Sequence, residues 1–121
     1  MSALRDLGEL ELQQIWEGVA ARALQGERLT LGVVELDSGA VVPEHHHEHE
    51  QLGVVIRGSV RFRVGDETRE LGPGGTWSIG SDVPHEVVAG ADGAVVVDVF
   101  APPRTDWAGL EAAPARDARW P

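Results

Sequence analysis

Residues 43–51 read Pro43-Glu44-His45-His46-His47-Glu48-His49-Glu50-Gln51 and hold four of the five histidines in this 121-residue chain. If this stretch is extended, alternate side chains point the same way, so His45, His47 and Gln51 share one face. The intervening His46 and His49 are expected to face solvent or to support the others. Convergent nitrogen and oxygen donors of this kind are what a metal site requires.

The fifth histidine, His85, follows Val83-Pro84 in a predicted turn, and a closed β-barrel could bring it to the same interior point. A polyhistidine run can also be a solvated loop or a tag remnant, and a lone histidine is often structural, but this run lies mid-chain between strand signals. We therefore expect one divalent metal ion, zinc, nickel, manganese or iron, bound by His45, His47, Gln51 and His85. Neutral ligands leave the cation its full charge, which favours Lewis-acid chemistry.

Short apolar stretches separated by glycine and proline clusters surround the histidine run. Residues 59–64 alternate apolar and polar side chains, which predicts a strand with one wet face. Residues 29–36, 52–57 and 94–100 are rich in β-branched side chains and are expected to be strands buried on both faces. Many short strands at close spacing indicate an all-β sandwich or barrel.

The amino-acid composition limits the partners that the chain can bind and the residue types that can take part in catalysis. The chain carries 20 acidic and 10 basic residues, a net charge of −10, and this balance argues against nucleic acid as a partner. It has no Lys, Cys or Tyr, so His, carboxylates, Arg, hydroxyls or a metal must supply any catalysis. No apolar run approaches the roughly 20 residues that span a bilayer, and the charged N-terminal stretch does not resemble a signal peptide. A cytoplasmic location without membrane contact is expected by default.

The chain is expected to form one domain. Residues 1–15 could be an arm or a short helix, residues 16–107 a barrel, and residues 108–121 a loosely held tail rich in Ala, Pro, Asp and Arg.

The histidine motifs resemble those of the cupin superfamily. Its first motif, with glycines flanking His-x-His and a carboxylate, corresponds here to Gly39, His45, His47, Gln51 and Gly58. Its second motif corresponds to Gly74, Gly80, Asp82, His85 and Ala89. The resemblance implies a single-domain cupin, which is a double-stranded β-helix or jelly-roll barrel. Gln51 stands where the motif has Glu, and this argues against oxygen-activating chemistry.

A second group of polar residues lies near the chain's last predicted strand. Asp98 interrupts the apolar run 95–100 and should be paired, wet or functional, since burying a lone carboxylate is costly. Arg104 follows six residues later and could pair with Asp98 or bind a ligand carboxylate. Both alternatives stay open on spacing alone.

The run Asp98-Val-Phe100-Ala-Pro-Pro-Arg104, with the histidine run, is similar to the pectin-degradation (KdgF-type) cupins. That resemblance implies ring opening of 4,5-unsaturated monouronates to linear keto acids, with Asp98, Phe100 and Arg104 as the catalytic residues and a carboxylate-bearing sugar as substrate. It also implies a homodimer with barrels paired edge to edge. Two alternatives remain, another cupin enzyme such as a dioxygenase or polyketide cyclase, and a non-catalytic module that binds a sugar acid or metal.

Overall fold

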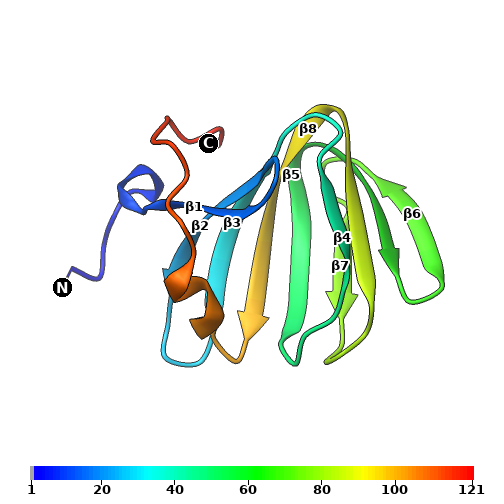
Figure 1. Ribbon diagram of the computed structural model, residues 1–121, viewed down its shortest axis with the longest axis horizontal. Coiled ribbons are helices and arrows are strands. Elements are labelled where there is room, and N and C mark those ends of the chain that lie inside the picture. Colours follow the sequence, from blue (N-terminus) through cyan, green and yellow to red (C-terminus); the bar gives the residue numbers. More distant parts are fainter. Residues whose placement is uncertain (1) are drawn as a thin grey trace.

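The computed structural model describes residues 2–121 and shows a β-barrel formed by one eight-stranded antiparallel sheet (Figure 1). Its strands are β1 (Leu12–Trp16), β2 (Val19–Gln25), β3 (Thr30–Leu36), β4 (Val41–His45), β5 (Glu50–Val64), β6 (Glu67–Leu71), β7 (Thr76–Ile79) and β8 (His85–Ala101). Two short 3-10 helices, η1 (Leu7–Glu9) and η2 (Thr105–Gly109), flank the strands. The described residues contain no helix long and apolar enough to span a membrane. The all-β prediction is confirmed.

The two longest strands, β5 and β8, lie at the centre of the sheet and pair antiparallel along nearly their whole length. The first half of β5 also pairs with β7, and the second half of β8 continues through β3 and β2 to β1. The other halves pair with β6 and β4. Because each long strand has different neighbours along its two halves, β5 and β8 carry the sheet around the barrel interior.

Two glycines allow these long strands to bend. The sequence predicts separate strands at 52–57 and 59–64 and a strand that starts only at residue 94, but the structure has one continuous strand, β5 or β8, in each place. Gly58 and Gly93 adopt φ values of 77° and 71°, which favour glycine, and a Cβ on Gly58 would collide with the backbone of Gly93. The register of β5 and β8 shifts beside Gly58. These glycines therefore mark bulges inside strands rather than ends of strands.

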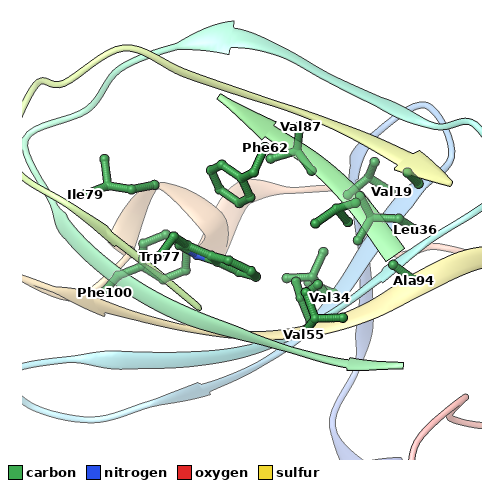
Figure 2. Packing of buried hydrophobic residues seen from close by; sticks show 14 of the residues in the cluster. Val19, Val34, Leu36, Val55, Phe62, Trp77, Ile79, Val87, Ala94 and Phe100 are labelled. Atoms are coloured by element: carbon green, nitrogen blue, oxygen red, sulfur yellow. The ribbon is translucent and has the colours of Figure 1, made fainter. Parts of the chain in front are cut away.

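The barrel interior is filled by apolar side chains that the surrounding strands point inward (Figure 2). Val60 and Phe62 are 1% and 5% exposed, so the alternation predicted for 59–64 is confirmed. Phe62 stacks on Trp77 with ring centroids 4.6 Å apart, and Trp107 of η2 joins the same cluster. Strand 52–57 differs from its prediction, since Leu52 is 50% exposed and only one face of this stretch is covered.

The C-terminal segment is attached to the sheet by a buried carboxylate. Glu35 of β3 is 1% exposed and forms ion pairs with Arg22 of β2 at 3.1 Å and with Arg116 at 2.9 Å, and it accepts the backbone N–H of Arg119. Burial alone would raise the pKa of Glu35, but the hydrogen bonds from Arg119 and Arg116 and the arginine charges lower it below its usual value. The sequence predicts a loosely held tail over residues 108–121 and did not anticipate these contacts.

The N-terminal segment contains one 3-10 turn followed by a strand. Strand β1 pairs with β2 of the same chain, and Gln13 bridges to Ala112 of the C-terminal segment. Residue 1 lies outside the described residues. The division of the chain at residues 15 and 107 stays a prediction.

Candidate metal centre

Three histidines meet at one point because two strands and one loop converge there. His45 ends β4 and pairs with His85 at the start of β8, and His47 lies in the loop that leads into β5. Each of the three offers a ring nitrogen, and these nitrogens lie within 4.8 Å of one another. The structure therefore brings together the three histidines that the sequence selects, including His85, which lies 38 positions after His47 in the printed chain.

Main-chain carbonyls fix the orientation and tautomer of all three rings. The Nδ1 atoms lie 2.8 Å from the carbonyl oxygen of Pro43 for His45, 3.0 Å from that of His49 for His47, and 2.9 Å from that of Val83 for His85. A carbonyl oxygen only accepts, so each Nδ1 carries the hydrogen and each Nε2 keeps a free lone pair. This arrangement is the usual support for a metal-binding histidine.

The free nitrogens fit a cation better than they fit the protein alone. The Nε2 atoms of His47 and His85 are buried without a hydrogen-bond partner among the described residues. The pKa of His85 is lowered to about 4, mainly by burial and also by the charges of His45, His47 and Arg104, against the opposing effect of the Val83 carbonyl. Burial likewise lowers the pKa of His47. Neutral imidazoles with orphaned Nε2 atoms are the donors that zinc and related divalent cations prefer.

Gln51 of β5 is buried beside these rings. Its Nε2 donates a hydrogen bond of 2.8 Å to Oδ1 of Asp98, so the amide is oriented with Oε1 as its remaining acceptor. Gln51 lines the same cavity as His45 and His85. The arrangement is compatible with Gln51 as a fourth oxygen ligand, and that role stays a prediction.

Asp98 of β8 is 6% exposed and receives two hydrogen bonds on one oxygen. Trp77 Nε1 donates to Oδ1 at 2.7 Å, in addition to Gln51. Burial raises the pKa of Asp98 to about 6, although these two donors and the charge of Arg104 act in the opposite direction. The second oxygen, Oδ2, has no donor among the described residues. Asp98 therefore lines the cavity with one fixed oxygen and one free for chemistry.

Glycines on both neighbouring strands make room for two indoles beside Asp98. Gly53 of β5 pairs with Asp98 on one side and with Trp77 on the other, and a Cβ at Gly53 would collide with the Trp77 indole. Gly32 of β3 pairs with Asp98 from the opposite side, where a Cβ would approach the Trp107 ring to 3.2 Å. The missing side chains allow Trp77 to reach across β5 to the carboxylate. Sequence reasoning missed Trp77, because no local pattern marks it.

Arg104 does not pair with Asp98, so the structure does not contain the simple ion pair that spacing left open. Its guanidinium binds Asp106, with Nε–Oδ1 and Nη2–Oδ2 distances of 3.1 and 3.0 Å. The Cζ atom lies 4.7 Å from the ring centroids of both Phe100 and Trp107. Phe100 also meets the His47 ring at 6.0 Å. Sequence reasoning missed Asp106, although its place two residues after Arg104 was a usable signal.

One cavity joins the polar groups, since His45, Gln51, His85, Asp98 and Arg104 all line it. Much of the remaining wall is apolar and comes from the barrel interior, with Val19, Val34, Leu36, Val42, Val87 and Val96 among its members. A few polar groups set in an apolar wall are typical of small-molecule sites.

The structure explains one departure from the second cupin motif, the one at Asp82. Asp82 adopts φ 60°, in the left-handed region that glycine prefers and that Asp tolerates better than most residues. Its backbone N–H donates to the His47 carbonyl at 2.8 Å, and its carboxylate lies 3.4 Å from His46, which is exposed. His49 is buried, and its carbonyl supports His47. The non-ligand histidines thus lie as expected, one in solvent and one behind a ring.

Comparisons with known proteins agree with this geometry. A family model described as a cupin domain matches residues 32–100. The pectin degradation protein KdgF of Dickeya dadantii is 27% identical over 101 residues, which is 82% of this chain and 92% of the relative. The solved structure of KdgF from Halomonas sp. is 29% identical with a TM-score of 0.80, covering 88% of this chain and 98% of that one. An RmlC-like cupin from Shewanella frigidimarina, at 24% identity and a TM-score of 0.81 over 88% of this chain and 96% of its own, supports the fold.

Proposed function

The chain belongs to the cupin family, and on that premise we propose that it is a metal-dependent enzyme that opens the ring of 4,5-unsaturated monouronates to give linear keto acids. The relatives named for pectin degradation support this reaction class. The observation that carries the proposal is the meeting of three histidines, whose ring nitrogens lie within 4.8 Å of one another, with a buried carboxyl of raised pKa in the cavity that His45 and His85 line.

His45, His47, His85 and Gln51 would hold the divalent cation. When bound there, it supplies a Lewis acid for the carboxylate and the ring or hydroxyl oxygens of the substrate. The ligand set leaves the metal open among zinc, nickel, manganese and iron.

Asp98 is suited to move the proton that the reaction requires. Its free Oδ2 takes the proton of the C1 hydroxyl as the C1–O5 bond breaks, so that C1 becomes an aldehyde and O5 keeps the electron pair as an enolate. Returning the proton to C4 converts the C4=C5 enolate into the C5 ketone, and the net reaction is an isomerisation. A pKa of about 6 lets Asp98 both accept and return a proton near neutral pH.

Phe100 and Arg104 complete the proposed site. The Phe100 ring would pack on the apolar face of the sugar, and the Arg104 guanidinium would bind the substrate carboxylate. The acidic net charge of the chain does not prevent this, because a cation and Arg104 dominate the field within the cavity.

The decisive assay follows the ultraviolet absorbance of the conjugated double bond and carboxylate in unsaturated monouronates released by a lyase. We expect metal-dependent loss of this absorbance, abolished by a chelator and restored by a divalent metal. No loss with metal-loaded protein would reject the reaction.

The apolar cavity wall favours one rival, a cupin enzyme that acts on a phenolic or polyketide ligand. Oxygen uptake or cyclisation with such ligands, without uronate turnover, would select it. Tight binding of a sugar acid with no turnover would select the binding module.

A homodimer and a cytoplasmic location stay predictions. An apolar row crosses four strands in register on the outer face of the sheet, formed by Leu24, Leu31, Val99 and Leu52. Leu24 and Leu52 are 45% and 50% exposed, and this row is a surface on which a second copy could pack. Light scattering should give a dimer mass that Leu52→Asp reduces.

A further inference from the structure

The Arg104 guanidinium has few directions left in which it can bind a ligand. Its Cζ atom lies over the ring of Phe100 and over the ring of Trp107, 4.7 Å from each centroid, so two aromatic rings occupy space beside it. Guanidinium N–H groups donate only in the plane of the guanidinium. Asp106 takes one edge of that plane, the edge formed by Nε and Nη2. The Nη1 group has no partner among the described residues.

The backbone of Arg104 is held as firmly as its side chain. Its N–H donates to the Thr30 hydroxyl at 2.9 Å, and Thr30 is 0% exposed. The Thr30 hydroxyl in turn donates to Gln25, whose amide reaches the Arg104 carbonyl at 3.4 Å. The N–H and the carbonyl of Arg104 are thus both bound by side chains of β2 and β3. The Arg104 side chain is only 11% exposed and lines the cavity that contains Asp98.

We propose that Asp106 is a positioning residue, which holds one edge of Arg104 so that the free Nη1 group faces the carboxylate of the substrate and makes the site selective for acids. The inference rests on the proposed function, in which Arg104 binds that carboxylate. An unsupported arginine samples many rotamers and loses that freedom when it binds, whereas an arginine already held in place binds at lower entropic cost.

Asp106 could instead weaken the binding of acids, and an experiment can distinguish this effect from positioning. Asp106 is an exposed carboxylate, with 55% of its side chain accessible, and it could instead compete with the substrate for the guanidinium. A competitor weakens acid binding, so its removal would tighten it. A positioning residue strengthens acid binding, so its removal weakens it.

The test compares wild-type protein with Asp106→Ala and Asp106→Glu, and uses Asp66→Asn as the control, because Asp66 is an exposed carboxylate in the β5–β6 turn. Thermal unfolding first shows that every variant folds. Calorimetry then measures binding of galacturonate and of its methyl ester to zinc-loaded protein. Steady-state kinetics on the unsaturated monouronate separate KM from kcat.

Asp106→Ala should weaken galacturonate binding and raise KM by roughly three- to tenfold, with kcat and ester binding changed much less. Asp106→Glu should recover part of the loss, and Asp66→Asn should behave as wild type. Unchanged or tighter acid binding by Asp106→Ala overturns the inference, and so does a wild-type protein with no preference for the acid.

The two hypotheses fail in different ways. Turnover by the wild type with an unaltered acid preference in Asp106→Ala rejects the inference alone. An acid preference that Asp106→Ala removes, in a protein without turnover, rejects the proposed reaction and supports the inference.

Discussion

Replacing Asp98 with Asn should stabilise the metal-free protein at neutral pH while it removes the proposed proton transfer. The substitution preserves the shape of the side chain. The asparagine oxygen can still accept the hydrogen bonds that Gln51 and Trp77 donate to Oδ1. What the change removes is a buried group that becomes charged.

The size of the effect follows from the pKa of Asp98, which burial raises from 3.8 to about 6. Between these values the folded protein holds a proton that the unfolded chain has released, so stability falls as the pH rises through this window. At about 1.36 kcal/mol per pKa unit, the full cost above pH 6 is roughly 3 kcal/mol. Asp98→Asn lacks this cost, so its advantage should be near zero below about pH 4 and complete near pH 7.

Urea unfolding of chelator-treated wild type and Asp98→Asn between pH 4 and pH 8 measures this difference directly, with Asp66→Asn as the exposed control. Activity of the metal-loaded Asp98→Asn protein should fall by about 10² to 10⁴. Parallel pH profiles for wild type and Asp98→Asn would refute the reasoning, because they would show that folding does not perturb this carboxyl. Retained activity would reject the role of Asp98 in proton transfer.

Substitutions at three further positions test the scaffold. Glu35→Gln should lower the free energy of unfolding by about 3 kcal/mol at pH 7, because it leaves the buried arginine charge without its partner. This loss should shrink as the pH falls below about 4.5, because the pKa of Glu35 is lowered in the folded state and the wild type itself then loses stability. Urea unfolding at both pH values measures the difference. Gly53→Ala should lower the free energy of unfolding by about 1–3 kcal/mol and reduce activity, because the new Cβ displaces Trp77 from Asp98. A melting temperature equal to that of wild type would show that Trp77 does not pack tightly against Gly53. Asp82→Gly should raise the free energy of unfolding by about 1 kcal/mol, because residue 82 has φ 60°, and Asp82→Val should lower it. Equal midpoints of chemical denaturation for the two variants would show that the turn is unstrained.

The meeting of His45, His47 and His85 could be predicted from a local pattern together with a family resemblance, and their role as metal ligands stays a prediction. His45 and His47 share a face through simple alternation, and the resemblance to cupins adds His85. The fold class followed from the same motifs together with many short apolar stretches. Strand boundaries were less predictable, since Gly58 is equally compatible with a turn and with a bulge inside a strand. Only the pairing of β5 with β8 decides between these two outcomes.

The surroundings of Asp98 could not be predicted, because they depend on register between distant strands. Trp77 reaches Asp98 only because Gly53 lies between them in the sheet, and this alignment joins β7, β5 and β8. The pairing of Arg104 with Asp106 was not anticipated either. Asp98 and Asp106 are both close in sequence, and the backbone hydrogen bonds of the turn after β8 direct the side chain toward Asp106.

The orientation of the three ligand rings rests entirely on backbone oxygens, at Pro43, His49 and Val83. Replacing the side chain of a supporting residue leaves its carbonyl in place, so the histidine geometry is insulated from mutation around it. Cavity residues such as Phe100 can then be exchanged for other shape-defining groups without dismantling the histidine set, whereas a change at Asp98 must keep the acceptor that orients Gln51. For protein engineering, this separates two tasks, retaining the cation and rewriting the chemistry beside it, and makes this small barrel a suitable starting scaffold for new metal-assisted reactions.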